Sequence, residues 1–259
     1  MKKTMKLFLP ILCMIAALVA LTLAAAAATE TGSCGSNATY TLDTATGVMV
    51  ISGTGDVRLP QDFGVRMGTT EIIIEKGVTS IGYYGIHRYE KLESVTVPES
   101  LSHVDQNAFV GCTRLAAVRI KSLERWAEIW FESADANPLY YAHHLYLDDE
   151  ELTVLNLPAG TRQIGAYAFC GGTAFTAVTI PASVKYVGYG VFGGCTSLAS
   201  ITVDRENKNY VEEGGVLLTA DRTKLISAAP GAIGSAYTLP DTVESIGTGA
   251  FCGCRALMN

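Results

Sequence analysis

The chain has 259 residues, enough for one large domain or two ordinary ones. Its 26 glycines, together with frequent Val, Ile, Leu and Thr, favour many short strands joined by tight turns over a helical protein. The formal net charge of −6 argues against nucleic acid and against anionic lipid as partners.

The first 28 residues have the pattern of an export signal. Lys2, Lys3 and Lys6 precede an apolar run that ends in five alanines, Ala24 to Ala28. This order predicts a signal peptide over residues 1–28. An uncleaved membrane anchor remains an alternative, because the run is just long enough to span a bilayer. Cleavage would remove three lysines and no acid, which takes the net charge from −6 to −9.

Residues 29–70 are predicted to form an N-terminal β-rich cap. Tyr40 and Leu42 alternate with polar residues on one predicted strand, and Val48 and Val50 do so on the next, with a turn at 43–47. We expect this hairpin to cover the first coil of whatever follows, because the end of a repeat array needs a different outer face.

A frame of 23 residues repeats through residues 71–259. It reads P-x-x-V-x-x-I-G-x-x-A-F-x-x-C-x-x-L-x-x-V-x-I, and the spacing is plain between Phe169 and Phe192. A fixed period of this length is typical of a solenoid, in which each repeat buries its apolar face against the next. Four copies begin at a proline and a weaker one begins at a valine: Pro98, Pro158, Pro181, Pro240 and Val78.

Each slot of the frame has a physical role. The L-x-x-V-x-I segment alternates like a strand with one inward face, and stacking such strands predicts a parallel sheet. The proline ends that strand, and the glycine permits a turn. We expect the structural core to contain the rings and leucines at the apolar slots: Phe109, Phe169, Phe192, Phe251, Leu115 and Leu198.

Six cysteines remain outside the predicted signal peptide, and three of them fill the small slot of the frame: Cys112, Cys195 and Cys254. We therefore predict a column of buried free thiols. Cys252 and Cys254 are too close in sequence for a comfortable disulfide, and pairing of Cys170 with Cys252 would have to cross the intervening coil.

Two segments, 121–156 and 204–239, break the period and are predicted to be inserted excursions. In the first, Ser122 is a predicted N-cap, and Trp126, Ile129 and Trp130 would share one helical face. A strand, an acidic turn at 148–151 and a second strand follow. The other excursion is predicted to be strand, turn at Asp221, strand. The last repeat copy stops at Asn259, before its strand, so we expect the chain to be truncated at its C-terminus.

The frame resembles the BspA-type leucine-rich repeats of bacterial surface proteins, and the segment from Cys34 to Asp56 resembles the one that often precedes them. Tyr89 and Gly172 at the Cys slot, and Asp105 at the Gly slot, depart from the pattern. The resemblance implies a mainly β leucine-rich-repeat solenoid with a parallel sheet. It also implies an extracellular or cell-surface protein that mediates protein–protein interaction or adhesion.

The sequence offers no catalytic or metal site, and we expect neither an enzyme nor a cofactor. His143 and His144 are adjacent, which makes a poor chelate on a strand, while His87 and His103 fall at variable slots and are predicted to be surface residues. The acidic runs fall on predicted solvated turns. No motif for a nucleophile, a phosphate loop or a zinc protease is present.

Binding is therefore the predicted activity, and two sets of residues are candidates for it. One set points outward from the main strands: Thr96, Arg119, Thr179 and Thr202. The other set is aromatic and belongs to the first excursion: Trp126, Trp130, Tyr140 and Tyr141. The alternative for these rings is that they cover the core of the solenoid. The partner would be an extracellular protein or a glycan, with membrane contact only through the signal segment or a missing anchor. A carbohydrate-binding module, or the repeat region of a larger enzyme or anchored protein, remains an alternative.

Overall fold

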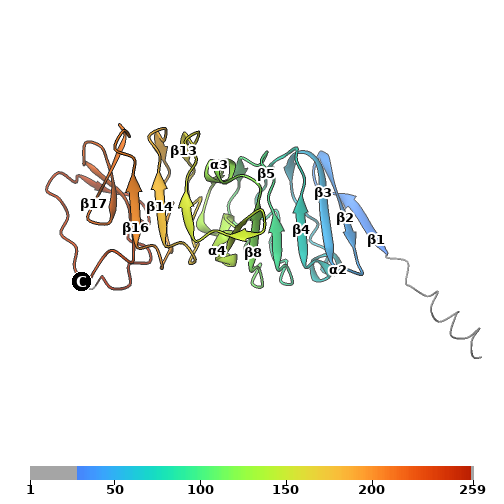
Figure 1. Ribbon diagram of the computed structural model, residues 1–259. Coiled ribbons are helices and arrows are strands. Elements are labelled where there is room, and N and C mark those ends of the chain that lie inside the picture. Colours follow the sequence, from blue (N-terminus) through green and yellow to red (C-terminus); the bar gives the residue numbers. More distant parts are fainter. Residues whose placement is uncertain (1–27, 258–259) are drawn as a thin grey trace, which may run out of the picture.

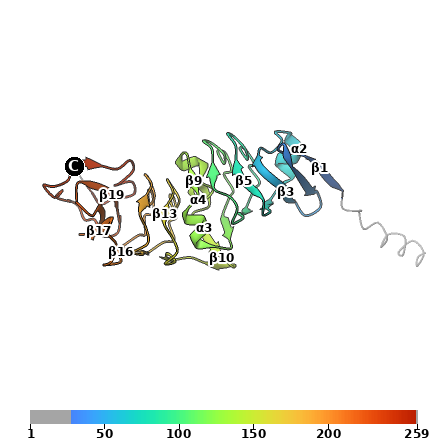
Figure 2. The same cartoon turned by 90° about the horizontal axis from the view of Figure 1, so that it is seen from above.

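The computed structural model describes residues 28–257, and these form an elongated stack of coils whose two ends lie far apart (Figure 1). Seen from above, the chain again progresses from one end of the stack to the other (Figure 2). The predicted signal peptide falls almost wholly on residues 1–27, outside the described residues. Within residues 28–257, no helix combines the length and the apolar character that crossing a membrane requires.

A parallel sheet, here called the first sheet, runs along one side of the stack. Its register pairs Ile72 with Val95 and Val95 with Val118, so partners lie one 23-residue period apart. The 23-residue period predicted from the sequence is therefore the offset between residues that pair in this sheet. The strands are β3 (Val48–Val57), β4 (Glu71–Ile74), β6 (Ser94–Thr96), β8 (Ala117–Ile120), β10 (Leu145–Leu147) and, in a separate ladder, β12 (Val154–Asn156), β14 (Ala177–Ile180) and β16 (Ser200–Val203).

A second parallel sheet forms where the frame reads V-x-x-I-G. The long strand β3 joins the two sheets, because its first half pairs with β4 and its second half with β5. A proline follows the first strand in three of these coils, at Pro98, Pro158 and Pro181, where it ends the strand. The second sheet contains β5 (Val78–Ile81), β7 (His103–Val104) and β9 (Trp130–Phe131), followed in another ladder by β13 (Gln163–Ile164) and β15 (Tyr186–Val187).

The N-terminal cap contains the predicted hairpin and one more strand. Strand β2 (Asn37–Asp43) pairs antiparallel with β3 on one side and with β1 (Thr29–Ser33) on the other. Tyr40 and Leu42 are buried as expected, but on β3 the buried residues are Met49 and Ile51 rather than Val48 and Val50. Met49 pairs with Ile72, so the stack already begins at β3. A short helix, α2 (Phe63–Gly68), completes the cap.

The first predicted excursion does not leave the stack, so that prediction is wrong for residues 121–147. These residues form a longer coil, in which Trp130–Phe131 pair with β7 and Leu145–Leu147 pair with β8. The extra length is taken up by α3 (Leu123–Ala127), the 3-10 helix η1 (Ala134–Ala136) and α4 (Leu139–Ala142). Ser122 caps α3 as predicted, with its Oγ accepting from the Arg125 amide at 3.2 Å.

A hairpin follows this coil and interrupts the first sheet. Strand β11 (Glu150–Glu151) folds back antiparallel on β10, so the turn lies at Asp148 and Asp149 and the two glutamates are on a strand. β12 then starts the second ladder of the first sheet.

The second excursion is a three-stranded antiparallel meander followed by the last copy of the frame. β17 (Tyr210–Glu213), β18 (Val216–Thr219) and β19 (Lys224–Ala228) pair in sequence, with the predicted turn at Asp221 between the last two. Glu212 and Glu213, one of the acidic runs expected on a turn, instead end β17, and the turn follows at Gly214–Gly215. β19 pairs in parallel with β20 (Ser245–Ile246), which returns the chain to the stack.

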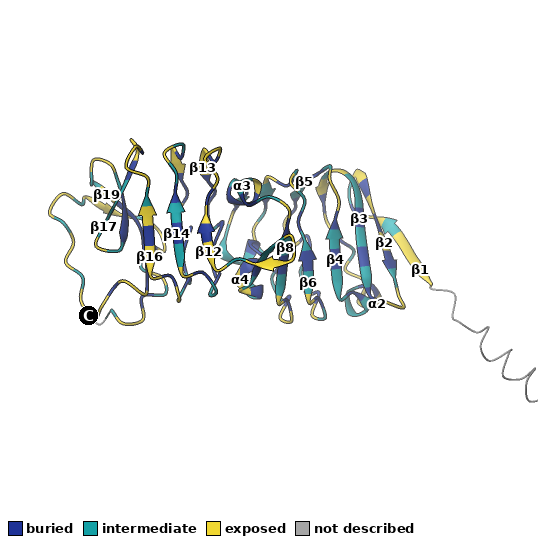
Figure 3. Cartoon of the chain, in the orientation of Figure 1, coloured by how far each residue is buried: buried dark blue, intermediate teal, exposed yellow. Residues whose placement is uncertain are grey.

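The core is a continuous column of side chains inside the coils, and most strands of the first sheet alternate between buried and less buried residues (Figure 3). Phe109, Phe169 and Phe192 are at most 1% exposed, and the Phe169 and Phe192 rings stack with centroids 5.9 Å apart. Leu115 and Leu198 are buried as predicted. Phe251 is only half-buried and packs in a separate small cluster at the end of the stack.

We expect Phe192→Ala to lower the free energy of unfolding by about 3–5 kcal/mol, because it opens a cavity between two stacked coils. Phe251→Ala should cost less, since this ring is half-buried. The exposed Thr202→Ala should change stability by no more than about 0.5 kcal/mol. Denaturant unfolding of the three variants checks this order. Equal losses for Phe192 and Thr202 would contradict the stacked core.

Candidate functional site

The structure separates the predicted binding residues onto different sides of the stack. Trp126 is 1% exposed, and its indole Nε1 donates to the carbonyl of Ala168 at 2.9 Å. Trp126 therefore follows the alternative prediction, a ring that covers the core, because the indole lies buried where α3 meets the following coil. Trp130, by contrast, is not on the helix at all and lies on β9.

The outward residues of the first sheet form two groups. Thr96 pairs with Arg119 in one ladder, and Thr179 pairs with Thr202 in the other, with the β10–β11 hairpin between them. Arg119 is engaged on two sides, because its Nη1 lies 2.6 Å from Asp149 Oδ1 and its guanidinium lies 5.3 Å from the centre of the Tyr146 ring. This face is therefore polar and divided, and its single cation is already paired.

Tyr140 and Tyr141 lie on α4 and not on a strand of either sheet. Tyr140 is 44% exposed and meets Tyr141 edge to face at 5.3 Å. They border a broad open depression of about 540 Å³ whose other walls include Gly171, Gly194 and Arg255. The two tyrosines therefore belong to a surface of their own.

Four aromatic side chains gather on the second sheet and the turns that follow it. The Trp130 ring lies nearly parallel to that of Tyr186 at 6.2 Å and edge to face with Tyr189 at 5.7 Å. Tyr189 in turn meets Tyr167 edge to face at 5.2 Å. We call these four residues the aromatic patch. Tyr186 and Tyr189 are 45% and 38% exposed, so the patch presents rings to solvent.

The repeat explains how this patch is assembled. Trp130 and Tyr186 hold the outward position of a second-sheet strand, whereas Tyr167 and Tyr189 come from the turns after the Gly slot. Gly190, with φ +64°, leaves room for the ring of Tyr167, because a Cβ there would lie 2.3 Å from Tyr167 Cε1. Only Trp130 was among the predicted binding residues. The outward positions of the V-x-x-I segments in the sequence could have indicated Tyr186 as well.

A cleft of about 160 Å³ adjoins the aromatic patch, between β15 and the C-terminal meander. Tyr186, Tyr189 and Tyr210 line it, and Lys224 is its one charged lining residue among those that the structure describes. Tyr210 also has a structural role, because its hydroxyl accepts from the Val187 amide at 2.8 Å. Burial raises the pKa of Tyr167 and of Tyr210 above the ordinary value, so both hydroxyls stay protonated at neutral pH.

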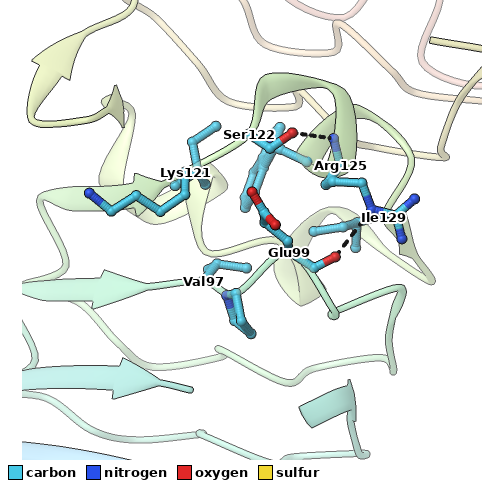
Figure 4. Close-up of a pocket in the computed structure, with 9 residues that line it drawn as sticks. Val97, Glu99, Lys121, Ser122, Arg125 and Ile129 are labelled. Carbon is cyan, nitrogen blue, oxygen red and sulfur yellow. Dashed lines mark hydrogen bonds between the residues drawn. The ribbon is translucent and has the colours of Figure 1, made fainter. Parts of the chain in front are cut away.

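A second, much smaller cavity lies between the turn after β6 and helix α3 (Figure 4). Its volume is about 10 Å³, room for roughly one water molecule. Arg125 closes its rim, with Nε donating to the carbonyl of Glu99 at 3.2 Å. This cavity is part of the packing of α3 and is too small for a ligand.

The six cysteines of residues 28–257 are all free, and those of the repeat's small slot are buried as predicted. The Cys112 and Cys195 thiols each donate to a carbonyl of the preceding coil at 3.1 Å. Burial raises the pKa of Cys112 and of Cys170 to about 12. Cys252 is the exposed member of the set.

These coils, with their two parallel ladders and an interior of leucine, valine and phenylalanine, define a leucine-rich-repeat solenoid. The chain belongs to the BspA-type leucine-rich-repeat family, whose sequence model matches residues 63–137, 142–214 and 234–259 in six copies. No match was found among curated proteins.

Several solved structures are similar to this chain, and one with a TM-score above 0.5 shares its fold. A leucine-rich-repeat protein from Eubacterium ventriosum is 24% identical with a TM-score of 0.60, and the similarity covers 90% of this chain but 59% of that one. The pneumococcal vaccine antigen PcpA is 17% identical, with a TM-score of 0.40, 90% of this chain and 69% of its own covered. A cell-surface protein of Faecalibacterium prausnitzii is 20% identical, with a TM-score of 0.37 over 89% and 69%. The chain thus spans well under two thirds of the Eubacterium protein.

The two tryptophans of the chain should report on two environments. The Trp126→Phe variant retains Trp130, whose fluorescence we expect to be several-fold more sensitive to acrylamide than that of the Trp130→Phe variant, which retains the buried Trp126. Stern–Volmer quenching measures the difference. Equal quenching would mean that the core position of Trp126 is wrong.

Thiol labelling should single out Cys252 among the cysteines of residues 28–257. The thiolate is the reactive form, and raising a thiol pKa from about 9 to about 12 lowers its fraction at pH 8 by about a thousandfold. Iodoacetamide followed by peptide mapping should find Cys252 modified long before Cys112 or Cys195, and Cys252→Ser should remove the fast phase. Early labelling of Cys112 would contradict its burial.

Proposed function

We propose that this chain is a non-catalytic recognition module, displayed outside a bacterial cell, that binds a protein through the aromatic patch. Membership of a family of bacterial surface proteins built on repeat scaffolds supports the location and the class of function. Repeat solenoids present extended, rigid surfaces, and recognition is their usual use.

The observation that carries the proposal is the aromatic patch itself. Tyrosine and tryptophan are enriched at interface hot spots, where large rings bury much area at a small cost in side-chain entropy. Trp130 and Tyr186 are fixed by strands, and Tyr189 is held by edge-to-face contacts with two other rings. The patch is therefore ordered before a partner arrives, which lowers the entropic cost of association.

The surroundings of the aromatic patch favour binding of a partner over catalysis. The adjoining cleft is lined by tyrosine, glycine and aliphatic residues, with Lys224 at its edge. A side chain of modest size from the partner could enter this cleft, while the rings of Tyr186 and Tyr189 contact the partner residues next to it. The polar face with Thr96, Arg119, Thr179 and Thr202 remains a second candidate surface, although Arg119 is occupied by Asp149.

A carbohydrate partner is the alternative that the same patch supports. Sugars stack on exposed aromatic faces, and the rings of Tyr186 and Tyr189 are partly open to solvent. A third alternative is that the chain serves a larger protein whose enzymatic or anchoring part lies elsewhere. The 59% coverage of the Eubacterium protein is consistent with such a division.

An array of extracellular-matrix proteins and glycans tests the proposal. We expect the protein to bind one or more array proteins, and the double variant Tyr186→Ala, Tyr189→Ala to lose at least about ten-fold in affinity, the scale of a hot spot. Tyr140→Ala is the matched control, because its ring is equally exposed but lies on another surface. It should bind like the unaltered protein.

Two results would overturn the protein-binding proposal. If the double variant binds array proteins as well as the Tyr140→Ala control does, the aromatic patch is not the contact surface. If only glycans bind, and the double variant loses them, the carbohydrate alternative is correct. Circular dichroism of both variants should show an unchanged fold, since these rings lie outside the core.

A further inference from the structure

Two successive coils depart from the frame at the position where the second-sheet strand ends. Gly82, Gly165, Gly188 and Gly247 occupy this position in other coils, whereas Asp105 and Glu132 occupy it in the two middle ones. The register confirms the equivalence, because His103 pairs with Trp130 and Val104 with Phe131. Two carboxylates thus stand at neighbouring rungs of one ladder.

Glycine is favoured at this position for a steric reason, so its replacement by Asp105 and Glu132 is informative. A Cβ at Gly165 would lie 1.8 Å from the carbonyl oxygen of Ile129, and one at Gly188 would lie 2.4 Å from the amide nitrogen of Ala166. The neighbouring coil leaves no space for a side chain there. At Asp105 and Glu132 the same position holds a carboxylate that is partly exposed to solvent and is not part of the apolar core.

His103 completes a cluster with these two acids. Its Nε2 lies 2.9 Å from Asp105 Oδ1 and 3.4 Å from Glu132 Oε1, and the three ligand atoms lie within 4.8 Å of one another. The second oxygen of Asp105 accepts from the Tyr83 amide at 3.1 Å, which fixes the carboxylate toward the imidazole. The side chains of the three residues are 38%, 32% and 40% exposed, so the cluster opens to solvent on one side.

The charges of this cluster are not balanced by the protein. Among residues 28–257, no Lys or Arg nitrogen lies within 4.0 Å of either carboxylate, and His103 is the shared partner of both. Two carboxylates at this separation repel each other. A bound cation would remove that repulsion and would use the lone pair of the imidazole at the same time.

We propose that His103, Asp105 and Glu132 bind a divalent transition-metal ion, with Zn²⁺ as the expected occupant. Zinc binds imidazole nitrogens and carboxylate oxygens with bonds of about 2.0–2.2 Å, so ligand atoms around a tetrahedral ion lie about 3.4 Å apart. The separations of 2.9 and 3.4 Å need little adjustment to reach that geometry. Imidazole favours zinc over the hard cations Ca²⁺ and Mg²⁺.

Three protein ligands leave a fourth coordination position toward solvent. The site adjoins Trp130 of the aromatic patch, because His103 and Trp130 are ladder partners. An ion there would offer a carboxylate or imidazole of another molecule a direct bond beside the exposed rings. The metal site stands independently of the proposed function, since it depends on these three side chains alone.

Isothermal titration of the full chain with Zn²⁺ tests this site. The expected result is one saturable site, weakened at least about ten-fold in His103→Ala and in Asp105→Gly, because each removes a ligand. Asp105→Gly restores the residue that the frame uses elsewhere, so it should keep the fold, as circular dichroism can verify. His144→Ala is the matched control, since His144 forms a pair with Glu151 at 2.6 Å that is not part of the cluster. It should leave Zn²⁺ affinity unchanged.

Three results would overturn the proposal. One is the absence of saturable Zn²⁺ binding to the unaltered chain. Another is binding that persists in both His103→Ala and Asp105→Gly, in which case Co²⁺ substitution should reveal a thiolate charge-transfer band and place the ion on cysteines. The third is Ca²⁺ or Mg²⁺ binding at the same affinity as Zn²⁺, which would exclude a site that depends on imidazole.

Discussion

The structure depends on backbone ladders between coils that are offset by a constant number of residues. When Ile72, Val95 and Val118 stand in register, every other slot of the frame stands in register too. Each coil then adds its apolar side chains to the column begun by the coil before it. Neither hydrogen bonding nor burial could be completed by one coil alone, so the unit of stability is the contact between neighbours.

The sequence predicts most of this arrangement because the ladder imposes a period on it. The core positions Phe109, Phe169 and Phe192, the buried thiol column and the strand of each frame all follow from spacing and residue type. Prediction fails at the coil of residues 121–147, where Val118 pairs with Leu145 across a longer interval. Once the interval changes, periodicity no longer signals that the chain is still in the stack.

The candidate sites were harder to predict for a different reason. Trp126 and Trp130 lie close together in a run that suggests one helical face, yet α3 ends at Ala127, which sends one indole inward and the other outward. Tyr167, Tyr186 and Tyr189 occupy variable slots, and only the coil-to-coil register brings them beside Trp130. Asp105 and Glu132 likewise appear unrelated until the longer coil is placed in the ladder.

The interruption at the β10–β11 hairpin has a mechanical consequence for the whole rod. Both sheets change ladder near this place, and within residues 28–257 no continuous ladder crosses it. Isolated bonds cross instead, such as the backbone bond from the Gly165 amide to the Ala127 carbonyl at 2.7 Å and the side-chain bond from the Trp126 indole to Ala168. A few isolated hydrogen bonds resist bending less than the continuous run of hydrogen bonds in a ladder. Under tension or torsion the rod should therefore flex at this joint first, with the aromatic patch lying across it.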